Sequence, residues 1–256
     1  MNNIFDSHAH YDDEAFDADR DELLSSLPEK GISNVINCGC ELRSCKTSLS
    51  LAEKYPFIYA ACGVHPQNCA EDVPLSELYD TYMPFWKDDR CVAVGEIGLD
   101  YHYDFSPKDM QISFFEAQVK IAVELQLPVI VHDREAHADS LAVLKKYRPS
   151  GVMHCFSGSV EMAQEILKLG MYIGLGGAVT FKNAKKPLEV AAAVPADRLL
   201  LETDCPYMTP VPFRGKRNDS SFIPYAAEKI AEVRNVTAQE ILDITDKNAR
   251  ELFKLQ

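Results

Sequence analysis

The sequence has 256 residues, 46% of them hydrophobic, so it is long enough for a large core and too apolar for a disordered chain. Its net charge of −13 excludes binding of nucleic acid or anionic membrane through a uniformly basic surface, although a local site can still carry cations. There is no Cys-x-x-Cys pair, no apolar run long enough to span a membrane and no visible signal peptide, so we expect a cytoplasmic protein with reduced thiols.

Eight short apolar runs, rich in branched residues and flanked by Gly or Pro, have the composition of buried parallel strands. They are residues 3–5, 33–39, 57–64, 91–99, 128–132, 151–156, 171–177 and 198–203. Helical patterns lie between and after them, most clearly at residues 19–31, 108–126, 159–170 and, as one or two helices, 237–253. The predicted apolar stripe of the second helix consists of Ile112, Phe115, Val119, Ala122 and Val123.

The alternation of strands and helices predicts a parallel sheet with helical crossovers, in an α/β fold. Eight such units in about 250 residues match a closed (β/α)8 barrel of the TIM type, and an open doubly wound sheet is the alternative. No linker or repeat interrupts the pattern, so we expect residues 1–256 to form one domain. The C-terminal strand ends of such a barrel share one mouth, where active sites are built.

Residues able to bind metal follow these runs. A single histidine at a strand end is usually a hydrogen-bonded core residue, but six candidate ligands at one end predict a metal site. They are His8, His10, Glu96, His132, His154 and Asp204. Strand alternation places His8, His10 and Asp6 on one face, and Glu202 on the face of Asp204.

Imidazole and carboxylate ligands suit zinc, manganese or iron better than calcium. Six ligands exceed the needs of one tetrahedral ion, whereas two ions that share a bridging carboxylate would use them all. Such a pair activates water and holds both oxygens of a displaced phosphate. The sequence therefore predicts a two-metal hydrolase.

Several segments together resemble the TatD family of metal-dependent deoxyribonucleases, which belongs to the amidohydrolase-type barrels. They are DSHAHYD (6–12), GVHP (63–66), GEIGLDYHYD (95–104), PVIVHDREA (128–136), HCFSGS (154–159) and LLLETDCPYMTP (199–210). The resemblance covers essentially the whole chain. It implies a 3′–5′ exonuclease or phosphodiesterase acting on DNA, with RNA or another phosphodiester as further possible substrates.

The resemblance also implies how the ligands divide between two divalent ions, whether magnesium, manganese or zinc. His8, His10 and Asp204 would hold one ion, His132 and His154 the other, and Glu96 would bridge them. We expect Asp204 to orient or deprotonate the attacking water while the metals and Arg134 stabilise charge on the phosphate.

Substrate contacts are predicted at three further places. The resemblance implies that His65 contacts phosphate or assists the leaving group, although it could simply fix its loop. Arg214 and Arg217 follow the eighth strand, where barrels often bind phosphate, but a solvated basic loop has the same composition. Tyr101, His102 and Tyr103 could stack on a base or pack over the mouth.

Two other functions remain open. The same site could hydrolyse an ester or amide, for example as an aminoacyl-tRNA deacylase, because metals polarise a carbonyl equally well. A non-catalytic scaffold is the third hypothesis. The sequence has neither a dinucleotide-binding loop after its first strand nor a P-loop, so no nucleotide cofactor is expected. It indicates no oligomeric state.

Overall fold

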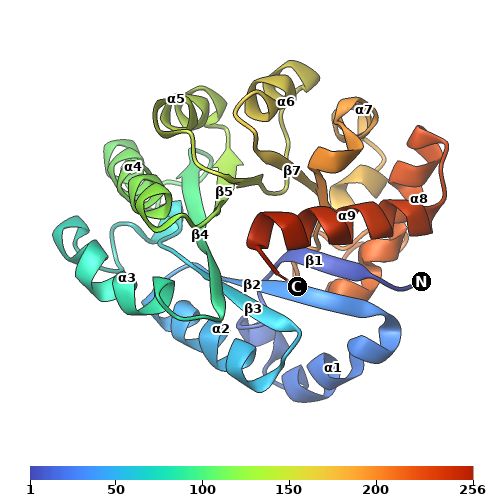
Figure 1. The fold of residues 1–256 in the computed structure, drawn as a ribbon, viewed down its shortest axis with the longest axis horizontal. Coiled ribbons are helices and arrows are strands. Elements are labelled where there is room, and N and C mark those ends of the chain that lie inside the picture. The colour runs from blue at the N-terminus through green and yellow to red at the C-terminus, as the bar shows by residue number, and fades with distance from the viewer. Residues whose placement is uncertain (256) are drawn as a thin grey trace.

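The computed structural model describes residues 1–255, whose strands form one parallel sheet in the order β1 to β8. The strands are β1 (Ile4–Ala9), β2 (Ile32–Gly39), β3 (Ile58–Cys62), β4 (Cys91–Asp100), β5 (Val129–Arg134), β6 (Gly151–Met153), β7 (Tyr172–Leu175) and β8 (Leu199–Leu201). Helices surround the sheet (Figure 1). They are α1 (Arg20–Ser26), α2 (Leu42–Lys54), α3 (Leu78–Trp86), α4 (Lys108–Leu125), α5 (His137–Tyr147), α6 (Val160–Leu167), α7 (Lys185–Ala193), α8 (Ile223–Arg234) and α9 (Ala238–Phe253).

The sheet closes on itself through residues that follow β8. Ala9 and Cys205 form a parallel bridge. The backbone N–H of His10 donates to the carbonyl of Cys205 at 2.8 Å, and the N–H of Asp204 donates to the carbonyl of His8 at 2.9 Å. The predicted closed barrel is therefore confirmed, and the alternative of an open sheet is wrong.

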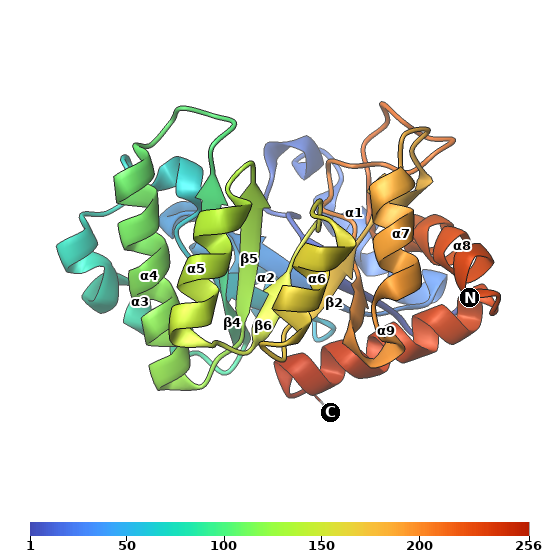
Figure 2. The same cartoon turned by 90° about the horizontal axis from the view of Figure 1, so that it is seen from above.

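Two apolar layers stabilise the barrel. An outer layer lies between strands and helices, and an inner layer combines residues from the strands with residues of α9. The rings of Phe5 in β1 and Phe253 in α9 stack with centroids 6.1 Å apart. Figure 2 shows α9 lying across one end of the barrel, with the long loops at the other end. The C-terminal segment is thus a single helix that closes the end opposite the loops.

The buried face of helix α4 differs in part from the predicted apolar stripe. Phe115, Val119 and Ala122 are buried as expected, but Val123 is 43% exposed. Gln118 is buried instead: its Nε2 donates to the carbonyl of Val64 at 3.0 Å, and its Oε1 accepts from the N–H of Val64 at 2.7 Å. Because Val64 lies beyond Cys62, where the pairing of β3 with its neighbouring strands ends, a polar side chain of α4 supplies the hydrogen-bond partners of its N–H and carbonyl.

A second buried glutamine, Gln111, forms hydrogen bonds in the same way with the backbone at the end of β4 and in the loop that follows. Its Oε1 accepts from the N–H of Asp100 at 2.9 Å, and its Nε2 donates to the carbonyl of Asp100 at 3.0 Å. The same amide group also donates to the carbonyl of Ser106 at 2.9 Å. Two glutamines of one helix therefore hold the loops that lead into the mouth.

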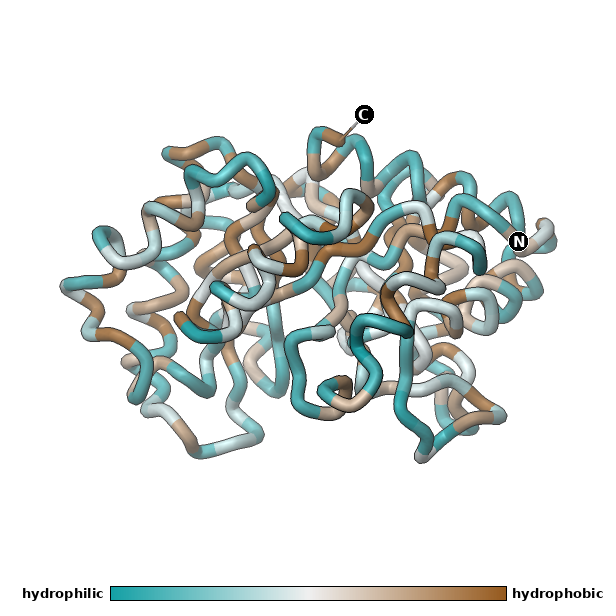
Figure 3. Tube along the Cα trace, turned by 90° about the horizontal axis from the view of Figure 1, so that it is seen from below, coloured by the Kyte–Doolittle hydropathy of each residue, from teal (hydrophilic) through white to brown (hydrophobic). Residues whose placement is uncertain are grey.

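Hydrophobic segments run through the middle of the molecule, while hydrophilic segments recur on the outer helices and loops (Figure 3). At the start of α6, Ser159 accepts from the N–H of Met162 at 3.3 Å and is the N-cap of the helix. None of the described helices is long and apolar enough to cross a membrane.

We predict that Gln118→Ala lowers the free energy of unfolding by at least about 2 kcal/mol, because it leaves a buried N–H and a buried carbonyl of Val64 without partners. Urea denaturation measures this change. The exposed Lys120 of the same helix provides the control, and Lys120→Ala should alter stability by less than about 0.5 kcal/mol. Equal effects of the two substitutions would contradict the role assigned to Gln118.

Candidate metal centre

The C-terminal strand ends surround a cavity of about 1040 Å³. Five of the six predicted metal ligands line it, and His8 is completely buried among them. The ligands come from β1, β4, β5 and the segments that follow β1, β6 and β8. The lining includes His10, Glu96, His132, His154 and Asp204, together with the predicted substrate residues His65 and Arg134.

Glu96 lies at the centre of this group, and its two carboxylate oxygens face different histidines. Oε2 lies 3.3 Å from Nε2 of His8 and 3.5 Å from Nε2 of His10. Oε1 lies 2.9 Å from Nδ1 of His132 and 2.8 Å from Nε2 of His154. One oxygen is thus available to each half of the site, as a bridging carboxylate requires.

Asp204 completes the half of the site that contains His8 and His10. Its Oδ1 lies 3.7 Å from Nε2 of His8 and 3.5 Å from Nε2 of His10. The two imidazole Nε2 atoms are 2.9 Å apart. Ligand atoms about 2.1 Å from one tetrahedral ion lie roughly 3.4 Å from each other. The spacing of this donor set therefore fits a divalent cation.

The electrostatics of the site combine an ionised Glu96 with histidines of both charge states. Burial alone would raise the pKa of Glu96, but the charges of His154, His65 and His8 hold it well below its usual value. Burial, together with the charge of His154, lowers the pKa of His8 to about 4. Burial alone would lower the pKa of His10, His132 and His154, but neighbouring acidic groups raise the pKa of all three, that of His132 to about 9. A neutral imidazole and an ionised carboxylate are the forms that coordinate a cation.

A carboxylate outside the predicted ligand set fixes the orientation of His132. Burial alone would raise the pKa of Asp100, but the hydrogen bonds from His132 and Gln67 hold it well below its usual value. Asp100 Oδ2 lies 3.2 Å from Nε2 of His132 and accepts from Nε2 of Gln67 at 2.8 Å. Nδ1 of His132 therefore points towards Glu96. Carboxylate partners of this kind set the tautomer and direction of metal-binding histidines.

Asp100 was not among the site residues predicted from the sequence, although it lies four residues after Glu96 within the motif GEIGLDYHYD. The separation is even, so strand alternation indicates a common face for the two carboxylates. That signal was sufficient to propose Asp100 as a member of the site. It was not sufficient to distinguish a ligand from a residue that supports one.

One placement derived from strand alternation, that of Asp6, is wrong. The pairing of β1 with β2 shifts register between Asp6 and Ala9, and the Asp6 carboxylate accepts from Thr203 Oγ1 at 2.6 Å and from Ser220 Oγ at 2.7 Å. It therefore does not join His8 and His10. Glu202, which follows regular β8, has its Oε1 3.8 Å from Nδ1 of His154, and the same oxygen accepts from the backbone N–H of Cys155.

Arg134 and His65 lie at the cavity. The guanidinium of Arg134 lies 4.9 Å from the ring centroid of Tyr103. Nε2 of His65 is 3.5 Å from Oε1 of Glu96, and its Nδ1 accepts from the N–H of Gln67 at 3.2 Å. His65 thus has both the loop-fixing contact and the proximity to the centre that the sequence left as alternatives.

Arg214 and Arg217 do not line the central cavity. Two nitrogens of the Arg217 guanidinium pair with the Asp19 carboxylate at 2.7 and 2.6 Å. The guanidinium of Arg214 lies 3.9 Å from the ring centroid of Phe181. Both cations thus have partners from segments far away in the sequence, and the structure does not bring them to the ligands.

Of the three ring-bearing residues considered in the sequence, Tyr103 lines the cavity and the other two do not. Tyr101 donates its hydroxyl to Asp139 at 2.7 Å, and Nδ1 of His102 is 2.9 Å from Oε1 of Glu135. Tyr103 stacks on Phe105, with ring centroids 5.4 Å apart.

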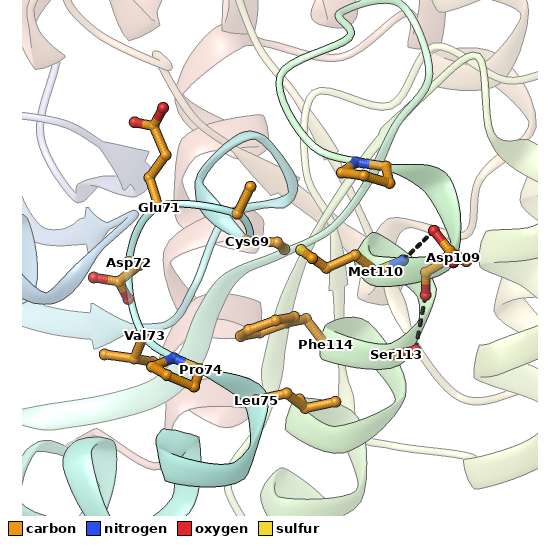
Figure 4. A pocket seen from close by; sticks show the side chains of 12 residues that line it. Cys69, Glu71, Asp72, Val73, Pro74, Leu75, Asp109, Met110, Ser113 and Phe114 are labelled. Atoms are coloured by element: carbon orange, nitrogen blue, oxygen red, sulfur yellow. Dashed lines mark hydrogen bonds between the residues drawn. The ribbon is translucent and has the colours of Figure 1, made fainter.

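A second cavity of about 610 Å³ lies between the loop at residues 69–75 and the start of α4. Figure 4 shows its side chains, including Phe114, Met110 and the acidic Glu71 and Asp72. No predicted site residue lines it. The predicted metal ligands therefore gather at the larger cavity and not at this one.

Comparison with known proteins identifies the family. Residues 5–254 match the family described as TatD related DNase. The chain belongs to the TatD family. It is 42% identical over 259 residues to the metal-dependent hydrolase YabD of Bacillus subtilis, with 98% of this chain and 99% of that protein covered.

Two further TatD relatives agree with this assignment. The protein named 3′–5′ ssDNA/RNA exonuclease TatD of Salmonella typhimurium is 34% identical over 261 residues, which cover 98% of this chain and 99% of that protein. The crystal structure of the TatD homologue YJJV from Escherichia coli K12 superposes with a TM-score of 0.92 at 32% identity, covering 99% of both chains. The predicted family, the barrel and the class of metal-dependent hydrolase are thus confirmed.

We predict that Asp100→Asn weakens the affinity of this TatD protein for manganese by about 10- to 100-fold, because His132 loses its carboxylate partner. Titration calorimetry measures the affinity. The control is Asp104→Asn, an exposed carboxylate in the same loop. Equal affinities in the two variants would show that Asp100 does not support the centre.

Proposed function

We propose that this chain is a two-metal phosphodiesterase that removes nucleotides from single-stranded DNA in the 3′–5′ direction, with RNA as a further substrate. The observation that carries the proposal is the bridging position of Glu96 between two groups of histidines. The relative named 3′–5′ ssDNA/RNA exonuclease TatD supports the choice of substrate.

The proposed centre uses the six ligands as two sets. His8, His10 and Asp204 would hold one divalent ion, His132 and His154 the other, and Glu96 would contribute one oxygen to each. The candidates are magnesium, manganese and zinc. When bound, such ions supply an activated water and neutralise charge on the phosphate.

The chain's own side chains supply the remaining functions. Burial alone would raise the pKa of Asp204, but its hydrogen bond with His10 and the charges of His154 and His8 keep it below the usual value. It therefore presents an ionised carboxylate that can orient a water molecule and accept its proton. Arg134 presents a guanidinium at the cavity, which suits a phosphate oxygen. His65 would contact the phosphate or the leaving group.

The aromatic residues of the mouth support a single-stranded substrate. Tyr103 and Phe105 are 42% and 62% exposed, and their rings stack at an interplanar angle of 21°. Exposed aromatic faces bind unpaired bases by stacking, whereas the bases of a duplex already stack on each other. The guanidinium of Arg134 beside Tyr103 places a cation where the backbone of the same strand would pass.

A second candidate function, hydrolysis of an aminoacyl ester or a related amide, is favoured by a different part of the cavity. One side of the lining is acidic and includes Asp12, Asp13, Glu14 and Asp17. Carboxylates there would repel a polyanion and attract the amino group of an aminoacyl ester. The two functions differ in which side of the cavity the substrate uses.

We predict that Asp204→Asn reduces metal-dependent hydrolysis of single-stranded DNA by at least about 100-fold, because the site loses a carboxylate able to accept a proton. Cleavage of an end-labelled oligonucleotide measures this loss, with thermal melting as the control for folding. The same assay with RNA, a generic phosphodiester and an aminoacyl ester compares the two functions. Wild-type rates in the variant would refute the role of Asp204.

We predict that Phe105→Ala raises the Kd for a single-stranded oligonucleotide by a factor corresponding to about 1–3 kcal/mol, the usual contribution of one stacked base. Fluorescence anisotropy measures the Kd. Hydrolysis of a small phosphodiester without a base should be unchanged. Tyr79→Ala, which removes an exposed aromatic ring outside the cavity, is the matched control. Unchanged oligonucleotide binding in Phe105→Ala would contradict a stacking role.

A further inference from the structure

A cysteine lies within reach of the centre and has no role in the function proposed above. Cys40 follows β2, is partly buried and lines the central cavity. Its Sγ lies 3.6 Å from Oε2 of Glu96 and 4.0 Å from Nδ1 of His10. Among residues 1–255, Cys40 is the one cysteine that forms part of a group of potential metal ligands, together with His10 and Glu96.

The backbone fixes the position of this thiol. The N–H of Cys40 donates to Oγ of Ser44 at 2.8 Å, and its carbonyl accepts from the N–H of His65 at 2.9 Å. Gly39, which precedes it, lies against α2 so closely that an added Cβ would come within 2.7 Å of Cys45. These contacts hold the backbone of Cys40 at the cavity without using the thiol, which stays available to a ligand.

The position of the sulphur matches that of a metal ligand. Nδ1 of His10 is 2.8 Å from the carbonyl of Cys38, which leaves Nε2 of His10 for the metal. Cys40 Sγ lies beside Oε2 of Glu96, the same oxygen that faces Nε2 of His10. For bonds of about 2.3 Å to sulphur and about 2.1 Å to oxygen, the angles of roughly 90–120° at a five-coordinate ion would separate the two donors by roughly 3.1–3.8 Å.

We propose that Cys40 is a fifth ligand of the ion held by His8, His10, Asp204 and one oxygen of Glu96, and that it is recruited by thiophilic cations. Zinc, cobalt and cadmium would bind the thiolate, and the thiol proton would pass to solvent without any redox change. Magnesium and manganese prefer oxygen ligands and would leave the thiol protonated. This inference rests on the proposed metal centre. The competing interpretation is a thiol that only donates a hydrogen bond to Glu96.

Loading the metal-free protein with cobalt tests the proposal. A cobalt–thiolate bond gives a charge-transfer band in the near ultraviolet, whereas histidine and carboxylate ligands give only the weaker visible bands. We expect both kinds of band in the wild-type protein. Cys40→Ser should lose the charge-transfer band and keep the visible bands. Cys155→Ser, which alters another partly buried cysteine that belongs to no candidate ligand group, should keep both.

Affinity provides a second readout. Cys40→Ser should bind cadmium roughly 10- to 100-fold more weakly, the range found when a metal site loses one supporting group, while its manganese affinity changes less than about twofold. The wild-type protein offers a measurement that does not depend on the folding of a variant. Cadmium should slow alkylation of Cys40, followed by mass spectrometry of its peptide, and manganese should not.

The outcomes separate this inference from the proposed function. Visible cobalt bands without a charge-transfer band in the wild-type protein, or alkylation of Cys40 that cadmium does not slow, would overturn the role of Cys40 and leave the histidine centre intact. If the wild-type protein binds no cobalt, manganese or cadmium, both the metal centre and the role of Cys40 are refuted.

Discussion

A buried carboxylate, Asp6, joins the first and last strands of the barrel, and the active site depends on that junction. Asp6 accepts hydrogen bonds from the N–H and the hydroxyl of Thr203, from Ser220 and from the N–H of His8. Burial raises its pKa to about 6 although these bonds act in the opposite direction. Because Thr203 is held in this way, the N–H of Asp204 reaches the carbonyl of His8, and its carboxylate faces His8 and His10.

Once the barrel is closed, Glu96 becomes the point at which both halves of the site meet. A single carboxylate facing several imidazoles is stable in a buried position because the histidines offset the cost of its desolvation. The same arrangement keeps several nitrogen ligands close together without metal. The chain therefore folds into a candidate metal site in which a buried carboxylate and the surrounding imidazoles stabilise each other.

The sequence was sufficient to predict the barrel and the gathering of the ligands, because strand ends and their order follow from hydrophobic patterns. One prediction failed where a local irregularity changed the direction of a side chain, at the register shift beside Asp6. Predictions also failed where partners are distant in the chain. The pairing of Arg217 with Asp19 and the contact of Gln118 with Val64 depend on tertiary structure that no local pattern reveals.

Helix α9 has a consequence for how a long substrate can be handled. Phe253 stacks on Phe5 inside the barrel, and neighbouring residues of the helix complete the same apolar layer. The cavity is therefore a dead end, and a polymer cannot thread through the molecule. A nucleic acid strand can reach Glu96 only by inserting a terminus or a tight bend, and each released product must leave by the opening through which the strand entered.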